Sequence, residues 1–159
     1  MAEFALVFPV LILVFMGIIQ LGVLFGAQIG LINGVREAAR YGSLSPTTAG
    51  NETANGAAVN NHLTTVVLPG SVFGYALANV RSSSVTYCSY QNPGGGTYSV
   101  RLTVTATYAH PLFVPLVGFI LDPFDGAMDS AFELSTSERF RVENVPLNNF
   151  EVAGMTACP

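Results

Sequence analysis

The feature that most constrains this chain is an uncharged stretch of 32 residues, Phe4 to Val35, bounded by Glu3 and Arg36. As one helix it would extend about 48 Å at about 1.5 Å per residue, whereas a bilayer core is spanned by about 20 residues. A secretory signal has a shorter apolar run behind a basic flank, and no Lys or Arg precedes Phe4. We therefore expect an N-terminal helix that can cross a membrane, is longer than crossing requires, and has already lost a short charged leader.

Small residues recur every four positions along the second half of this stretch and just beyond it. Each glycine weakens a helix by roughly 1 kcal/mol relative to alanine, so the run indicates a close neighbour on that face. Small residues let apolar helices approach within van der Waals contact of each other. The predicted contacts with neighbouring copies are Gly22, Gly26, Gly30, Gly34 and Ala38, with Gly42 continuing the series. The chain's own second helix or sheet is the alternative occupant, above all from Gly34 to Gly42.

Glu3 places one carboxylate at the head of the apolar helix. It can mark the helix start at a membrane interface, where it complements the helix dipole. If the helices pack into a dry bundle, Glu3 needs a cation, and the nearest is an α-amino group, its own or a neighbour's. In that case the pairing would set the stagger between subunits.

The remainder of the chain predicts an α+β fold. Apolar spacing from Val59 to Val67 indicates a second, short helix at roughly 47–67, ended by Leu68-Pro69-Gly70. Strict alternation from Ser99 to Tyr108 predicts a half-buried antiparallel strand, flanked by strands at 83–90 and 131–142 in a three-stranded meander. We expect residues 1–42 to form a membrane or filament-core helix, and residues 43–159 to form a globular head with a C-terminal tail.

The segment from His110 to Met128 is apolar through most of its length, which is unusual for a connection this long. It folds under the sheet as core or it forms a subunit contact, and the sequence leaves both open.

Composition bears on the chemistry that the chain can perform. It contains six arginines, no lysine and a net charge of −4, which argues against nucleic-acid binding. No nucleophile–base pair or phosphate-binding glycine loop is evident, so we expect no enzymatic activity and no cofactor. His62 and His110 lack partners at metal-ligand spacing. The spacing of Asp122, Asp125 and Asp129 does not follow a calcium-binding loop, so we interpret these three aspartates as solvated loop acids.

Two further motifs concern covalent modification. Cys88 and Cys158 are the only cysteines, and in an oxidising exterior they favour a disulfide, with free buried thiols as the alternative. Asn51-Glu52-Thr53 is a glycosylation sequon, a pattern that often occurs by chance.

The segments AEFALVFPVLILVFMGIIQLG, GVREAARYG and FELSTSERFRVE together resemble TadE-like pilins and pseudopilins of tight-adherence secretion systems, over residues up to about Glu143. The resemblance implies a type IV pilin-like subunit that a prepilin peptidase cleaves after a short basic leader. It also implies that the subunit is held in the cytoplasmic membrane until pilus assembly machinery transfers it to a filament.

Residues and resemblance together predict a structural subunit of an extracellular filament, a homopolymer held together by its N-terminal helices. The alternative is a membrane-anchored minor pseudopilin, or an assembly or adhesion module that does not form the bulk of a filament.

Overall fold

The computed structural model describes residues 2–114, 130–143 and 147–159, with the side chains of residues 2, 3, 5 and 6 left out. The elements in chain order are α1 (Ala2–Ser43), α2 (Glu52–His62), a π-helical turn (Leu63–Val67), α3 (Leu68–Ser71), a 3-10 turn (Leu77–Asn79), β1 (Val80–Gln91), β2 (Tyr98–Pro111), β3 (Ala131–Arg141) and α5 (Asn149–Val152). The α+β prediction is confirmed: a long apolar helix, a shorter helix and a three-stranded antiparallel sheet.

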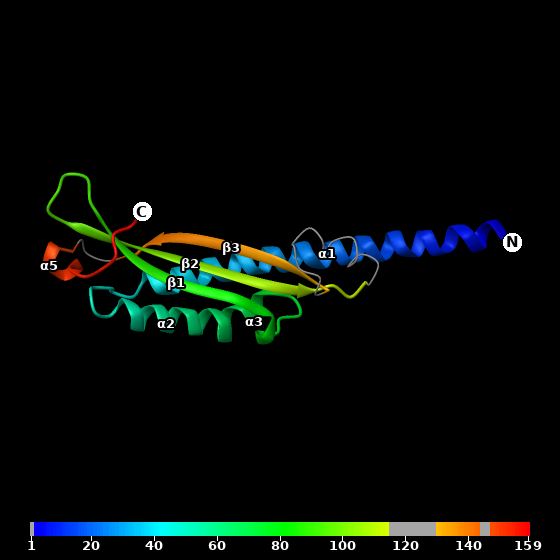
Figure 1. The fold of residues 1–159 in the computed structure, drawn as a ribbon, viewed down its shortest axis with the longest axis horizontal. Coiled ribbons are helices and arrows are strands. Elements are labelled where there is room, and N and C mark those ends of the chain that lie inside the picture. Colours follow the sequence, from blue (N-terminus) through cyan, green and yellow to red (C-terminus); the bar gives the residue numbers. More distant parts are fainter. Residues whose placement is uncertain (1, 115–129, 144–146) are drawn as a thin grey trace.

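The sheet has the order β1-β2-β3, with both pairs antiparallel (Figure 1). Its register follows the sequence alternation, because Leu102 of β2 lies between Tyr87 of β1 and Phe140 of β3. The apolar side chains of β2 that were predicted to share one face are all buried, at 2 % exposure or less: Val100, Leu102, Val104, Ala106 and Tyr108. β1 and β2 are longer than the alternation alone indicated, whereas β3 ends at Arg141, one residue before the expected end.

Both helices cover the same face of the sheet, with α1 along β2 and β3 and α2 along β1 (Figure 1). Leu31 and Val35 of α1 are fully buried in this core, together with Leu63 at the end of the second helix. The C-terminal half of α1 is therefore part of the head's own core. Its N-terminal half continues past the end of the sheet as a single rod.

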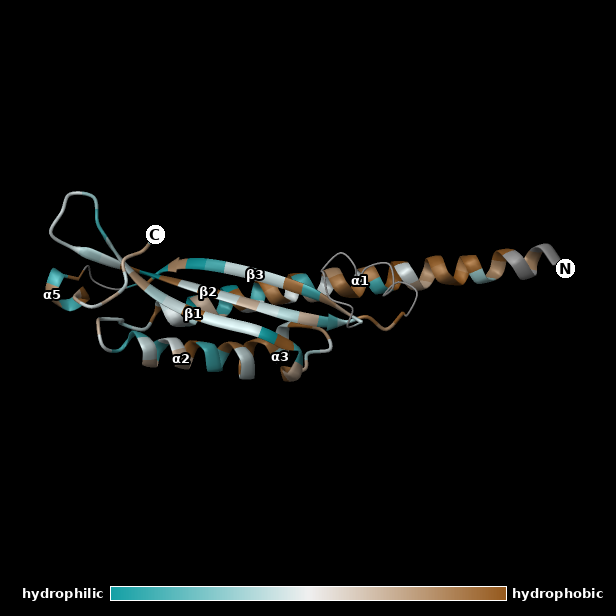
Figure 2. Ribbon diagram, viewed as in Figure 1, coloured by the Kyte–Doolittle hydropathy of each residue, from teal (hydrophilic) through white to brown (hydrophobic). Residues whose placement is uncertain are grey.

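Hydrophobic residues predominate along the described part of the projecting rod (Figure 2). Phe4, Phe15 and Ile18 are each more than half exposed, although such side chains are normally buried. By length and composition, α1 from Val7 onward could cross a membrane. So large an apolar surface indicates contact with lipid or with other protein.

The second helix differs from its prediction at both ends. Gly50 has a φ of +99°, a left-handed conformation that interrupts the helix, so α2 begins at Glu52 and not near residue 47. At the other end the helical path runs through Pro69 to Ser71. In a π-helix the carbonyl of Thr64 would accept a hydrogen bond from the N–H group five residues later. That residue is Pro69, which has no N–H group, and the Tyr75 hydroxyl donates to the Thr64 oxygen instead, at 2.7 Å.

Thr136 and Glu138 interrupt the apolar face of β3, which is an edge strand of the sheet. The structure explains Glu138: its Oε1 lies 2.8 Å from the Nε of Arg36 on α1. Both side chains remain partly exposed, so this ion pair orients the helix on the sheet more than it stabilises the fold.

Candidate functional site: a groove on the N-terminal helix

The small residues of α1 divide into two groups according to what lies against them. At Gly30, an added Cβ would overlap the backbone carbonyl of Ser71, whose carbon would lie 2.9 Å away. At Gly34 the nearest atom is a methyl group of Leu68, also at 2.9 Å. These two glycines therefore let α3 pack directly on the backbone of α1.

The next two positions of the series are also covered by the chain itself. Ala38 is fully buried in the core, and a Cβ at Gly42 would lie 2.6 Å from Leu102 and 2.8 Å from Val59. The sequence predicted that Gly30, Gly34 and Ala38 contact neighbouring copies. In the structure these positions are covered by the chain's own helix and sheet, which was the alternative. Gly22 and Gly26 are the predicted positions that the chain itself leaves uncovered, and subunit packing at them stays a prediction.

Gly30→Ala is expected to lower the melting temperature of the purified protein by several degrees. The new methyl group meets backbone rather than a flexible side chain, so α3 has to move, and overpacking of this kind typically costs about 1–3 kcal/mol. Gly22→Ala is the matched control, because it adds the same methyl group to the same helix in open space. Equal melting temperatures for the two variants would contradict the close approach at Gly30.

Gly22 and Gly26 are exposed, and a Cβ at either would have no neighbour within 4 Å. Together with Ile19, Val23 and Phe73 they line an open groove of about 390 Å³. The lining is almost entirely apolar, which suits a helix or a lipid chain better than a polar ligand. We call this the upper groove.

Phe73 forms one wall of the upper groove, although its side chain is 71 % exposed. Its position follows from the packing below it: the carbonyl of Ser71 abuts Gly30, and Val72 is buried at 3 % exposure. Because these two residues fix α3 on α1, the next residue is held beside Gly26. Phe73 was not predicted as a site residue from the sequence. The available signal was its position as a large apolar residue directly before Gly74.

Two glutamines, eight residues apart on α1, contact the sheet side of the molecule. Oε1 of Gln20, which is fully buried, accepts hydrogen bonds from the backbone N–H groups of Phe113 at 3.1 Å and Val114 at 3.3 Å. Gln28 donates from Nε2 to the carbonyl of Ser135 at 3.4 Å. These isolated amides in an apolar run connect α1 to the chain after β2 and to the middle of β3.

Other predicted site residues do not gather at the upper groove. The backbone of Glu3 belongs to α1, but its side chain lies outside the description, so its pairing stays a prediction. The segment from residue 115 to 128 and all three loop aspartates, Asp122, Asp125 and Asp129, also fall outside the described residues. No cluster of metal-binding side chains occurs in the described part of the chain.

The two histidines have other contacts. The ring of His62 stacks on Tyr41 with centroids 4.2 Å apart, and Nδ1 of His110 lies 3.1 Å from the carbonyl oxygen of Pro111. The side chain of Asn51 accepts from the backbone N–H of Thr48 at 2.8 Å and donates to the carbonyl of Pro46. Glycosylation of Asn51 stays a prediction, and it would require this turn to open.

The predicted disulfide is present, joining Cys88 of β1 to Cys158 in the C-terminal tail. The tail runs parallel to β1 at this point, and Ser89 exchanges two backbone hydrogen bonds with Thr156 and Cys158, each 2.9 Å long. The disulfide therefore holds the tail on the outer edge of the sheet, at the end remote from the rod.

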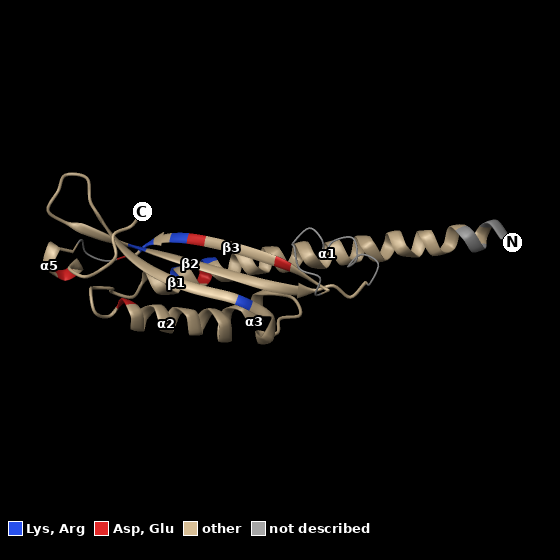
Figure 3. Cartoon of the chain, in the orientation of Figure 1, with Lys and Arg blue, Asp and Glu red and all other residues tan. Residues whose placement is uncertain are grey.

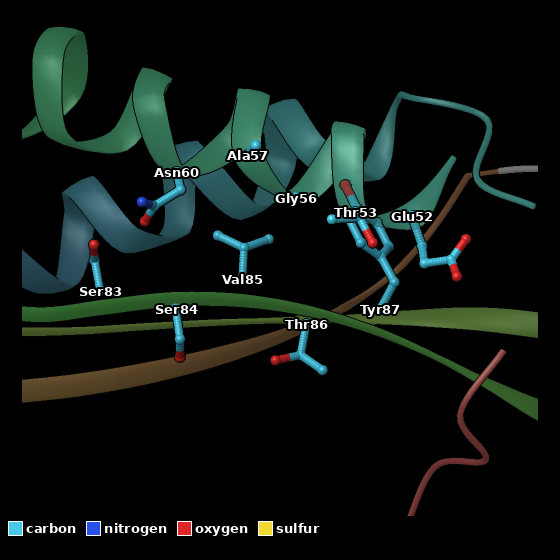
Figure 4. A pocket seen from close by; sticks show the side chains of 10 residues that line it. All are labelled: Glu52, Thr53, Gly56, Ala57, Asn60, Ser83, Ser84, Val85, Thr86 and Tyr87. Carbon is cyan, nitrogen blue, oxygen red and sulfur yellow. The ribbon is translucent and has the colours of Figure 1, made fainter. Parts of the chain in front are cut away.

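A second groove, of about 460 Å³, lies between α2 and β1 (Figure 4). Gly56 and Val85 approach each other at its centre, since a Cβ on Gly56 would lie 3.4 Å from the Val85 carbonyl oxygen. Its side chains are mainly hydroxyl and amide groups, with Glu52 and Tyr87 as the titratable ones. This lining supplies hydrogen bonds but no paired acid and base of the kind that catalysis requires.

Burial raises the pKa of the Tyr87 hydroxyl above its ordinary value of 10.0; a hydrogen bond with Thr47 opposes this rise and the charge of Tyr41 adds to it. The unfolded chain therefore loses this proton first, and the free energy of unfolding falls as the pH rises above about 10. We expect Tyr87→Phe to reduce this alkaline loss in thermal melts between pH 8 and pH 11. An unchanged alkaline loss in Tyr87→Phe would contradict the assignment.

Comparison with known proteins gives one match: residues 1–40 match the family model described as TadE-like protein. No curated protein and no solved structure matches the chain. The resemblance seen in the sequence is thus confirmed for the segment that contains the rod and the α1 residues of the upper groove. TadE-like proteins are a structural, pilus-associated family, and an apolar helix of this kind fits membrane anchoring.

Proposed function

We propose, from the TadE-like N-terminal segment, that this chain is a structural subunit of an extracellular type IV pilus-like filament. In this proposal the exposed part of α1 forms the filament core and residues 43–159 form the displayed head. The observation that carries it is the upper groove, where Gly22 and Gly26 remain open on the same helix whose Gly30, Gly34 and Gly42 are already covered by the chain itself. A rod from a neighbouring copy is the occupant that this groove fits.

Close van der Waals contact would drive assembly, because lipid is as apolar as the rods and gives no hydrophobic advantage to their association. Before assembly the exposed rod lies in the cytoplasmic membrane, and on polymerisation neighbouring rods replace the lipid around it. Glu3 would then pair with an α-amino group and set the stagger between copies. The proposal includes processing by a prepilin peptidase and delivery by pilus assembly machinery, and the TadE-like match of the N-terminal segment supports an association with such machinery.

The test is to shear the surface of producing cells and to image the released material by electron microscopy. Mass spectrometry of purified fibres should identify this chain as the main component and give its mature N-terminus. Fibres that contain the chain only in trace amounts, with the bulk in the membrane fraction, would favour the alternative role of a membrane-anchored minor pseudopilin.

A further inference from the structure

The face of the sheet that the helices leave uncovered presents rows of hydroxyl groups. The strand register places Ser84, Thr105 and Ser137 side by side across the three strands. The rows on either side are similar, so the set on this face is Ser82, Ser84, Thr86, Thr103, Thr105, Thr107, Ser135 and Ser137. Adjacent hydroxyls lie within hydrogen-bond distance, at 3.0 Å between Thr105 and Ser137. We call this surface the outer face.

Three of the six arginines stand at one end of the outer face. Arg101 of β2 is directly opposite Arg141 of β3, and Arg139 follows in the next row beside Thr103 (Figure 3). Like charges in directly opposed cross-strand positions destabilise a sheet. An acidic chain that places its scarce cations in this way has a surface suited to an anion.

Two of these three guanidinium groups are oriented by uncharged partners. Arg141 donates to the hydroxyl of Ser99 at 2.8 Å, and Arg101 lies 5.2 Å from the ring centroid of Tyr90. Arg139 is exposed. No carboxylate among the described residues forms a salt bridge with any of the three. Their charge is therefore available to a partner, and the planar guanidinium group matches a carboxylate in a two-point contact.

The arginine cluster lies far from the apolar rod. Arg101 is near the start of β2, and the other end of that strand, at Pro111, approaches Gln20 of the rod. Ten residues of strand separate these ends, about 33 Å at about 3.3 Å per residue. A membrane that surrounds the rod is therefore out of reach, which argues against lipid headgroups as the anion.

We propose that the outer face binds an acidic polysaccharide. The guanidinium groups of Arg101, Arg139 and Arg141 hold its carboxylates, and the neighbouring serine and threonine hydroxyls bond to its sugar hydroxyls. Charge complementarity selects an anion, and the rows of hydroxyls select a polyhydroxylated chain over a nucleic acid, which presents phosphates and stacked bases. This inference does not depend on whether the chain is a major or a minor component of a filament.

The test measures binding of the full chain, in detergent micelles at about 0.15 M salt, to immobilised polygalacturonate. Neutral dextran, double-stranded DNA and anionic phospholipid vesicles are the comparison probes. Arg139→Gln should weaken binding to polygalacturonate about fivefold, and the triple Gln variant of the cluster on the order of a hundredfold. Arg40→Gln is the matched control, because it removes an exposed arginine from α1 and should leave binding unchanged.

Circular dichroism and thermal melts first establish that each variant is folded. If the triple variant does not fold, the test relies on Arg139→Gln alone. Selective binding to polygalacturonate that is weakened in Arg139→Gln and unchanged in Arg40→Gln supports the proposal. It is overturned by any of three results: no binding to polygalacturonate, equal loss in Arg40→Gln, or binding to DNA or vesicles as tight as to polygalacturonate. Loss of assembly in Arg139→Gln with unchanged polysaccharide binding would instead make the outer face an interface between copies, and would equally overturn it.

Discussion

Gly26→Leu is expected to abolish filaments and to leave the folded subunit and its membrane insertion intact. The added side chain fills the upper groove, so a neighbouring rod can no longer approach the backbone of α1 there. Within the subunit a Cβ at Gly26 meets no atom within 4 Å, and the rest of the leucine side chain extends into the open groove, so we expect the subunit to fold. Replacing a helical glycine also adds roughly 1 kcal/mol of helix propensity. Electron microscopy of sheared material and the melting temperature of the purified subunit measure the two effects separately.

The matched control is Gly70→Leu, at another exposed helical glycine that has no neighbour within 4 Å of an added Cβ. It makes the same chemical change on α3, outside the upper groove, and should assemble like the wild type. Normal filaments from Gly26→Leu would show that the rods do not pack at this position. In a protein that uses its rod only as an anchor, neither variant would change behaviour.

Loss of the Cys88–Cys158 disulfide is expected to lower the free energy of unfolding by about 4 kcal/mol. This magnitude follows from the chain-entropy model, in which a bond between residues 70 positions apart restricts the unfolded chain. The Cys88→Ser, Cys158→Ser double variant should therefore unfold at a lower urea concentration than the wild type. Its tail would keep the two backbone hydrogen bonds with Ser89 and the packing of Val152 and Met155 on the core, and should become sensitive to protease before the sheet does.

Reductant provides the internal control for this measurement. It should shift the wild type to the midpoint of the double variant and leave the double variant unchanged. A reductant-sensitive double variant, or a wild type whose midpoint does not respond, would mean that the disulfide does not contribute to stability as expected.

The fold could be predicted largely because its signals are local. Alternation around Leu102 specified a strand with one buried face, and the glycines of the turn at residues 94–96 adopt the positive φ angles that a hairpin loop of this kind needs. The bounds of the second helix were less accurate. They depend on the conformation of Gly50 and on the hydroxyl of Tyr75, which replaces the N–H group that Pro69 lacks.

The candidate site was harder to predict, because a run of small residues shows that something packs closely but not what it is. Gly22 and Gly30 have the same spacing and the same apolar surroundings in the sequence, yet only Gly30 lies under α3. That difference depends on where the segment after residue 68 packs on α1, and this contact joins residues that are far apart in the sequence. Phe73 was missed for the same reason, since its place beside Gly26 is set by the seating of Ser71 and Val72.

One consequence follows from the unbroken course of α1 from Ala2 to Ser43. The helix that projects from the head is the same helix whose Leu31 and Val35 lie in the head's core, so no hinge separates the two parts. A force applied at the N-terminal end of α1 is therefore transmitted to all the buried apolar contacts between α1 and the sheet at the same time. The head does not rotate about a flexible linker. In an assembly under tension, each displayed domain would keep a constant orientation relative to the fibre axis.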